Sequence, residues 1–223
     1  TTLNNLLQQL KEADYTGWSK EVPLFIHIDG GFNPETLAVA KNFKWSYGPL
    51  VIDARDQNVG LRSMWLDSIG TAAHDVGDNS LLLVFEDDVI VSPDYFQWLL
   101  ASIDAYARNP KCRDSNLIGF SLSPIIYQEM HKPFYKWDAR EVLGSRSSND
   151  HRHLAYLSAV PSSWGAAYWS EHWKEFDEFV RIRMQPPFYF VDEETANVTD
   201  YGELKLTPDF FFIPNARSNV WPK

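Results

Sequence analysis

Three consecutive carboxylates interrupt an otherwise apolar stretch of this chain and constrain its fold more than any other feature. Glu86, Asp87 and Asp88 stand between the runs 81–85 and 89–91, which are apolar and as short as strands. Adjacent acids at the edge of a core are costly unless positive charge compensates them. Strand ends are also where α/β proteins usually bind ligands. The stretch therefore predicts a strand that ends at a divalent cation carrying a phosphorylated substrate.

The composition indicates a folded domain and restricts its partners. The 223 residues are 44% hydrophobic and 15% aromatic, which supports a large core and argues against disorder. A net charge of −10 argues against nucleic acid or an anionic membrane as the main partner, although a bound metal can reverse the local sign. We find no signal peptide and no membrane-spanning run. The single cysteine, Cys112, leaves the compartment undecided, with the cytoplasm slightly favoured over the secretory-pathway lumen.

Strand and helix patterns alternate through the first 110 residues. Leucines at helical spacing predict a helix over 1–12, and further helices are expected over 34–40, after Gly60 and after Pro93. Later in the chain, apolar residues at helical spacing over 169–180 predict another. Strands are predicted at 23–31, where the last residues form a turn, and at 50–53, 81–85, 117–122 and 156–160, with 81–85 as the central strand. The alternation indicates an α/β fold, and we expect one domain over 1–223, which could be cut from a longer chain.

The acidic triplet offers two kinds of side chain to a ligand. Side chains alternate along a strand, so Glu86 and Asp88 are expected on one side and Asp87 on the other. One acid can then bind a metal while its neighbours accept hydrogen bonds from ribose or sugar hydroxyls. A solvated acidic turn is the alternative. We favour a functional site because the flanking apolar runs place the acids at the edge of a core.

A second polar segment, 53–62, follows the strand at 50–53 and leads into a helix. Its backbone N–H groups and Arg62 could meet a phosphate at the start of that helix. Asp56 and Asn58 could contact the edge of a uracil or a ribose. The alternative is an ordinary loop in which Asp56 and Arg62 form a local ion pair.

The segment 129–153 is locally basic within an acidic protein. Arg140, Arg146 or Arg152 could neutralise a diphosphate from a lid, but charge runs are usually solvated, and that interpretation is preferred. His151 and His153 have a spacing that gives only a weak metal signal.

Trp164-Gly165 is predicted to lie between a strand and a helix. The indole could stack on a sugar face, with the glycine permitting close approach. A core tryptophan is the competing interpretation.

The run 85–89, followed by Ser92-Pro93-Asp94-Tyr95-Phe96, resembles a known pair of elements. These are the acidic metal motif and the aromatic-bearing helix of the N-acetylglucosaminyltransferase I type, within the GT-A class of nucleotide-sugar glycosyltransferases. The segments 163–169 and 173–176 are similar to the acceptor-side loop and helix of that family, and 204–218 is a looser match to its closing segment.

The resemblance implies a GT-A fold, a Rossmann-like mixed sheet flanked by helices, and a UDP-sugar donor. It makes Asp88 the ligand of Mn²⁺ or Mg²⁺, and it places Glu86 and Asp87 against the donor sugar and ribose. The physical chemistry agrees, because carboxylate oxygens suit these cations and the metal offsets charge on a leaving diphosphate. The first strand of GT-A folds delivers groups to the base and ribose, which makes Asp29 a further candidate. A simple strand-to-turn aspartate is the alternative for that residue.

The catalytic base of an inverting enzyme should be an acid on the acceptor side. In the resembled family this base follows the glycine-aromatic helix, and the element that carries it is not cleanly matched here. Asp192 and Glu193, in the acidic run 192–194, are the expected catalytic residues. The other candidates are Asp177, Asp200 and Glu203.

We therefore expect a metal-dependent glycosyltransferase that moves a sugar from a UDP-sugar to a hydroxyl of a glycan or glycoprotein. One alternative is a Mg²⁺-dependent sugar nucleotidyltransferase, although Gly30-Gly31 lacks the basic cluster that such enzymes often carry after an early glycine-rich loop. The other is a non-enzymatic carbohydrate-binding domain. Such modules are mostly all-β, whereas this pattern is α/β.

Overall fold

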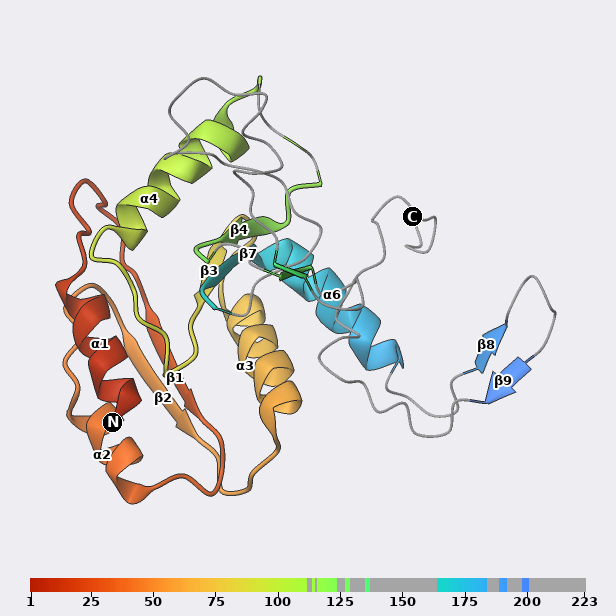
Figure 1. The fold of residues 1–223 in the computed structure, drawn as a ribbon, viewed down its shortest axis with the longest axis horizontal. Coiled ribbons are helices and arrows are strands. Elements are labelled where there is room, and N and C mark those ends of the chain that lie inside the picture. Colours follow the sequence, from red (N-terminus) through yellow and green to blue (C-terminus); the bar gives the residue numbers. More distant parts are fainter. Residues whose placement is uncertain are drawn as a thin grey trace.

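The α/β class expected from the alternating pattern is confirmed by the arrangement of helices and short sheets in Figure 1. The computed structural model describes residues 1–111, 114, 116–123, 127–128, 135–136, 164–183, 189–191 and 198–200. The predicted strand 156–160, the basic segment with Arg140, Arg146 and Arg152, and His151 and His153 lie outside these ranges.

Two helices and a parallel pair of strands form the N-terminal part. In chain order they are α1 (Thr2–Glu12), β1 (Leu24–Ile28), α2 (Pro34–Asn42) and β2 (Leu50–Ala54). Both helices begin where a side chain accepts a hydrogen bond from an otherwise unpaired N–H, at Thr1 from Asn4 and at Asn33 from Glu35. β1 and β2 pair in parallel from Leu24 opposite Leu50 to Ile28 opposite Ala54.

An apolar core fixes α1 and α2 on one face of this strand pair. Alternate side chains of β1 point to that face, which the two helices cover with their leucine, alanine and phenylalanine side chains. The buried members of this first core are Leu3, Leu7, Ile26, Ile28, Ala40 and Phe43. The helix predicted over 1–12 is thus confirmed, and its leucines pack against the strand pair.

The chain then continues through α3 (Leu61–Asp75), β3 (Leu81–Val84) and α4 (Tyr95–Ser102). A π-helix at Ile103–Arg108 prolongs α4, so the helical span expected after Pro93 is present but changes its winding. Tyr95 and Phe96 at the start of α4 pack against Leu6 and Leu10 of α1. This second core holds the segment after the acidic triplet against the N-terminal helix.

β3 belongs to a separate three-stranded antiparallel sheet, in the order β3-β7-β4. β4 is Gly119–Ser121, β7 is Ala166–Trp169, and α6 (Ser170–Arg183) follows β7 directly. Two expectations are corrected here: 81–84 is an edge strand of this sheet, and Trp169 ends a strand before the helix begins. The second difference has a packing reason: Ala166 and Ala167 are 2% and 0% exposed, and their small side chains let β7 fit between β3 and β4.

Two small antiparallel pairs complete the described elements. They are β5 (Tyr127–Gln128) with β6 (Tyr135–Lys136), and β8 (Tyr189–Val191) with β9 (Val198–Asp200). Within the described ranges, no helix is both long and apolar enough to cross a membrane.

Candidate functional site

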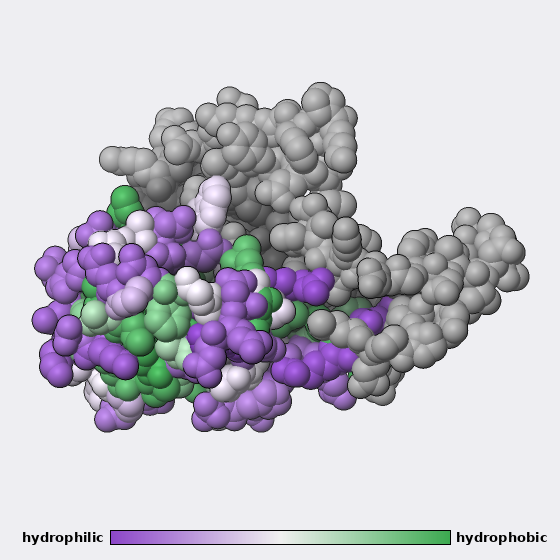
Figure 2. All heavy atoms as spheres, turned by 90° about the horizontal axis from the view of Figure 1, so that it is seen from below, coloured by the Kyte–Doolittle hydropathy of each residue, from purple (hydrophilic) through white to green (hydrophobic). Residues whose placement is uncertain are grey.

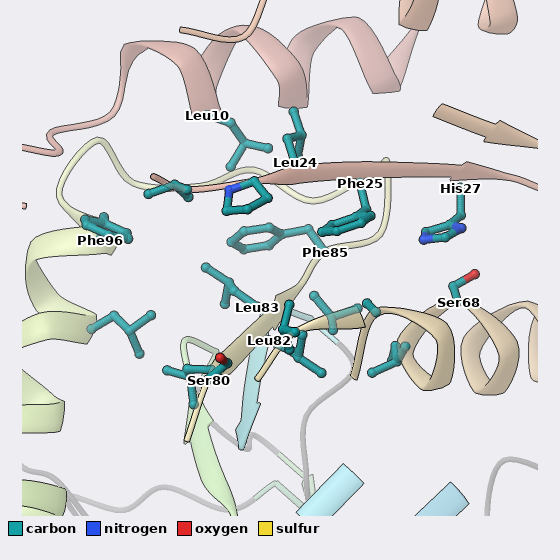
Figure 3. Close-up of a pocket in the computed structure, with 18 of the residues that line it drawn as sticks. Leu10, Leu24, Phe25, His27, Ser68, Ser80, Leu82, Leu83, Phe85 and Phe96 are labelled. Atoms are coloured by element: carbon teal, nitrogen blue, oxygen red, sulfur yellow. The ribbon is translucent and has the colours of Figure 1, made fainter. Parts of the chain in front are cut away.

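A cavity of about 1420 Å³ lies between β1 and β3 (Figure 3). Leu24 and Phe25 line it from β1, and Leu82, Leu83 and Phe85 line it from β3 and its end. One face of α3 forms a further wall, whereas none of the described residues of β2 contributes to the lining. The cavity therefore borders the edge of β1 that β2 leaves uncovered. Figure 2 views the molecule from below, where polar side chains surround apolar ones on the described face.

The structure brings the predicted acids to this one cavity. Glu86, Asp87 and Asp88 line it after the end of β3, and Asp29 lines it after the end of β1. Asp87 and Asp88 are exposed, whereas Glu86 is half-buried. The hydroxyl of Thr2 donates a hydrogen bond to Asp87, which places this carboxylate beside the first turn of α1. The positive end of that helix favours a negative charge at this place.

Glu86 is electrostatically distinct from its two neighbours. Burial raises its pKa above the ordinary value, and the charges of Asp88 and Asp87 act in the same direction. A hydrogen bond from the side chain of Trp65 on α3 acts in the opposite direction. The site thus holds one partly desolvated carboxyl group next to two hydrated carboxylates.

The Asp29 carboxylate is hydrogen-bonded within the protein. Its carboxylate accepts hydrogen bonds from the backbone N–H groups of Gly30 at 2.8 Å, Val59 at 2.9 Å and Gly60 at 2.9 Å. The bond from Val59 is the first cause that lowers the pKa of Asp29 below its ordinary value, with those from Gly30 and Gly60 acting the same way. The aspartate therefore fastens the loop after β2 to the end of β1, a role that the sequence did not indicate.

The same loop is held by a second contact. The side-chain amide of Asn58 donates to the carbonyl of Gly30 at 3.0 Å. Gly30 is required there, since a Cβ on it would lie 2.0 Å from the carbonyl carbon of Gln57. Asn58, expected to contact a base or a ribose, is thus used in docking the loop.

Asp56 and Arg62, the other predicted residues of this segment, do not line the cavity. Asp56 is exposed on the loop, and Arg62 lies in the first turn of α3. A nearby ion pair was not foreseen: Arg55 lies 3.0 Å from Asp67 and ties the start of the loop to α3. A role of Asp56 and Arg62 toward phosphate or base remains a prediction.

Pairing between β3 and β7 brings Trp164 and Gly165 beside the acids. Val84 pairs with Ala166, so the chain before β7 runs alongside the chain after β3. A Cβ on Gly165 would lie 3.2 Å from the ring of Phe85, the residue before Glu86. Trp164 is 55% exposed, so its indole is not buried in a core. The structure thus favours the surface interpretation of this tryptophan over the core interpretation.

One residue that the sequence did not single out is His27 of β1. Its Nδ1 lies 3.3 Å from the Asp53 carboxylate of β2, while its Nε2 is buried and has no hydrogen-bond partner. The hydroxyl of Ser68 on α3 is also buried without a partner, and both residues line the cavity. The available signal was alternation: Phe25, His27 and Asp29 share one face of β1, opposite to the buried Ile26 and Ile28.

Of the acids named as possible catalytic bases, Asp177 is the one whose side chain the structure describes, and it does not line the cavity. Asp192 and Glu193 lie outside the described residues, as does Glu203, and only the backbone of Asp200 is described, in β9. Asp177 is 3% exposed on α6 and lies against α3. Its carboxylate accepts a 2.7 Å hydrogen bond from Arg181, which also belongs to α6. Its place between two helices indicates a packing role.

The donor set for a metal is small. Within the described ranges, no group of three or more His, Cys, Asp or Glu side chains is arranged to hold a metal ion. Asp87 and Asp88 nevertheless offer exposed carboxylate oxygens, which hard divalent cations prefer. These oxygens fit a cation that takes most of its remaining ligands from a bound diphosphate and water.

Comparison of the chain with models of protein families, with curated proteins and with solved structures finds no match. The functional argument therefore depends on the residues and their geometry.

Proposed function

We propose that the protein is a metal-dependent glycosyltransferase that transfers a sugar from a nucleoside diphosphate sugar, expected to be a UDP-sugar, to a hydroxyl of a glycan or glycoprotein. The observation that carries the proposal is the convergence of four acids on one cavity. Asp29 reaches it from the end of β1, and Glu86, Asp87 and Asp88 reach it from the end of β3. A cavity of about 1420 Å³ exceeds the usual volume of a small-molecule site and has room for a nucleotide sugar.

The order of the strands supports the proposal. From β1 the chain passes through α2 to β2 on one side, and from β2 it passes through α3 to β3 on the other side of β1. Ligands of open α/β sheets bind outside the carboxyl ends of strands at such a switch point. The four acids follow the carboxyl ends of β1 and β3. We infer a GT-A-like arrangement in which the carboxyl ends of these two strands, which belong to separate sheets, face the same cavity.

The acids of the triplet would have different roles in binding the donor. Asp88 would hold Mn²⁺ or Mg²⁺, and such a cation would neutralise charge on the diphosphate as it leaves. Glu86, partly desolvated and held by Trp65, has an oxygen suited to a ribose or sugar hydroxyl. In the transfer, the acceptor oxygen bonds to the anomeric carbon, the bond from that carbon to the diphosphate breaks, and a carboxylate base takes the acceptor proton.

The exposed Trp164 supports an acceptor or sugar subsite next to the triplet. The pairing of Val84 with Ala166 brings the chain before β7 alongside the chain after β3, and Trp164, which does not itself line the cavity, is 55% exposed. Flat indole faces bind the apolar faces of sugar rings, whereas a core tryptophan would be enclosed. Replacement with alanine should therefore weaken binding of a sugar-bearing ligand more than binding of UDP.

The direct test is a UDP-release screen across nucleotide sugars, with Mn²⁺ and with EDTA. A glycosyltransferase should release UDP with at least one donor and acceptor in the presence of Mn²⁺, and EDTA should abolish the release. A binding domain would retain the sugar without releasing UDP, and a nucleotidyltransferase would release pyrophosphate or consume it.

The matched variant is Asp88→Asn, which keeps the shape of the side chain and removes its charge. Calorimetry should show that this variant loses Mn²⁺-dependent binding of UDP while its melting temperature is unchanged. Asp75→Asn is the control, because Asp75 is also exposed, lies at the far end of α3 and does not line the cavity. Equal UDP affinity in Asp88→Asn and the wild type would refute the proposed role of the triplet.

A further inference from the structure

We propose that the part of the cavity between β1 and β3, the interstrand space, binds an extended polypeptide segment that adds a strand to both strand edges. This acceptor segment carries the serine or threonine hydroxyl to which the sugar is transferred. The inference rests on the proposed function, since it identifies the acceptor as a polypeptide. The binding itself can be tested separately, because it depends on the strand edges and not on the acids.

Each of the two strands has one edge that no described strand occupies. Among the described strands, β1 pairs only with β2, and β3 is an outer strand in the order β3-β7-β4. Both strands line the same cavity over their whole length (Figure 3). A row of unpaired N–H and C=O groups on a strand edge is a template for another chain.

The pairing with β2 determines which backbone groups of β1 face the cavity. The N–H of Leu24 donates to a carbonyl of the chain before β2 at 2.8 Å, and the carbonyl of Ile28 accepts from the chain after β2 at 3.0 Å. Backbone groups of successive residues along a strand alternate between its two edges. The N–H and C=O groups of Phe25 and His27 therefore point away from β2, toward the interstrand space.

The pairing with β7 gives the same result for β3. The carbonyl of Ser80 accepts a 2.9 Å hydrogen bond from Ser170, so the even-numbered residues of β3 direct their backbone groups to β7. Those of Leu81 and Leu83 point to the opposite edge. Both residues are partly exposed, as are the two residues of β1 with the same role.

A polypeptide is the ligand that matches these groups. Among the described residues, none forms a backbone hydrogen bond with Phe25, His27, Leu81 or Leu83 from the cavity side. Backbone N–H and C=O groups away from water are paired in the great majority of cases. An extended chain offers its own N–H and C=O groups on both sides with the repeat of a strand, which a sugar or a hydrocarbon chain does not. Strand addition of this kind is a known mode of peptide recognition.

The walls of the interstrand space indicate the side chains of the acceptor segment. Leu83 of β3 packs against α1 and the start of α4 on one face of the strand, and Leu82 packs against α3 on the other. A strand covered on both faces is apolar at successive positions rather than at alternate ones. We therefore expect a run of apolar residues about as long as β3, which has four residues.

The acids lie at one end of the interstrand space. Asp29 follows the last residue of β1, and Glu86 follows the last residue of β3 by two positions. A hydroxyl residue next to the apolar run would lie beside these carboxylates. Its oxygen would bond to the anomeric carbon of the donor as the bond to the diphosphate breaks, and a carboxylate would take the proton. A cavity of about 1420 Å³ is larger than a usual small-molecule site and has room for the donor as well as the segment.

The first test is amide hydrogen exchange of the wild-type protein, followed by NMR. The probe is an acetylated, amidated peptide, Lys-Lys-Val-Ile-Val-Val-Thr-Ser, whose lysines keep it in solution. In the free protein the amides of Phe25, His27, Leu81 and Leu83 should exchange faster than that of Leu82, which pairs with β7. The peptide should slow their exchange by about tenfold or more. If the four amides are as protected as Leu82 without peptide, the two strands pair with each other and the inference is overturned.

The second test changes the peptide and leaves the protein intact. Methyl groups on alternate backbone nitrogens of the apolar run remove the N–H groups on one edge and keep every side chain. Calorimetry should show that either alternate set weakens binding by about tenfold or more, because the segment bonds on both edges. Equal affinity of the methylated and unmethylated peptides would overturn the inference, as would sensitivity to one set alone.

The third test removes one donor of the protein. Phe25→Pro and Phe25→Ala both lose the ring, and only the proline also loses the N–H that faces the interstrand space. That N–H does not pair with β2, and proline is tolerated on a free strand edge. Phe25→Pro should bind the peptide roughly 2- to 13-fold more weakly than Phe25→Ala, the range for one hydrogen bond. Equal affinity at equal melting temperature would contradict the inference, and the methylated peptides test the same bonds if the proline variant does not fold.

The outcomes separate this inference from the proposed function. If UDP is released with a glycan acceptor but the peptide leaves the four amides unprotected, the inference fails and the glycosyltransferase proposal stands. If the peptide binds as expected but no nucleotide sugar releases UDP with any acceptor, strand addition stands and the glycosyltransferase proposal fails.

Discussion

The contact between α3 and α6 gives a quantitative test of the packing role of Asp177. Its carboxylate is 3% exposed and accepts a 2.7 Å hydrogen bond from Arg181, one turn later on α6. His74 of α3 lies 3.8 Å from the same oxygen. Gly70 permits the close approach of the helices, because a Cβ there would lie 3.2 Å from Asp177 Oδ1.

Substitution of Asp177 and substitution of Arg181 should lower the free energy of unfolding by different amounts. In Asp177→Ala the Arg181 side chain, already 60% exposed, turns to water, so the loss is one charge-assisted hydrogen bond, about 2 kcal/mol. In Arg181→Met the carboxylate stays buried without its cation, and a cost of about 3 kcal/mol or more is expected. For a chain of this size each kcal/mol lowers the melting temperature by roughly 2–4 °C.

The assay is urea denaturation followed by circular dichroism, with Glu178→Ala as the exposed control on the same helix. UDP release should be unchanged in Asp177→Ala below its melting temperature. A smaller loss of stability in Arg181→Met than in Asp177→Ala would refute the argument from burial. Loss of UDP release with wild-type stability would instead make Asp177 the catalytic base.

Three further variants test the local arguments. Gly165→Ala adds a Cβ at a φ of +78° beside Phe85 and should cost roughly 1–2 kcal/mol in urea denaturation, whereas equal stability would contradict the strain. Asp29→Asn should melt below the wild type above about pH 4, and this gap should close as the pH falls through the lowered pKa of Asp29; a gap independent of pH would contradict the role of the charge. Leu7→Ala, at a side chain 2% exposed, should cost about 2–5 kcal/mol, against almost nothing for Leu61→Ala at 63% exposure.

Local sequence patterns were sufficient for most elements of the first 110 residues. Leucines at helical spacing, an Asn33-Pro34 start and apolar runs of strand length depend on interactions within a few residues of each other. For that reason α1, α2, α3, β1 and β2 lie where the sequence predicts them. The position of the acids after β3 was predictable in the same way, because a strand of apolar residues is expected to leave the core where three carboxylates follow it.

The strand at 166–169 could not be predicted from its residues. Alanine is not a strong strand former, and Tyr168 and Trp169 continue the aromatic spacing of the helix that follows. These residues become a strand because β3 and β4 offer hydrogen bonds on both sides. The strand partners that decide this local structure lie 47 and 86 residues earlier along the chain, counted from the pairs Phe120–Ala167 and Leu82–Tyr168.

The sequence by itself determined which residues carry charge at the end of a strand, because a run of apolar residues and a run of acids are local facts. Only the tertiary structure decided how those residues are used. In the folded protein the Asp29 carboxylate accepts hydrogen bonds from three backbone N–H groups, and the Asn58 amide donates to the carbonyl of Gly30. Asp177 packs between two helices. His27 Nε2 and Ser68 Oγ have no hydrogen-bond partner. The physical reason is that a hydrogen bond depends on distance in space, and residues 29 and 59 meet only when the strands and loops pack.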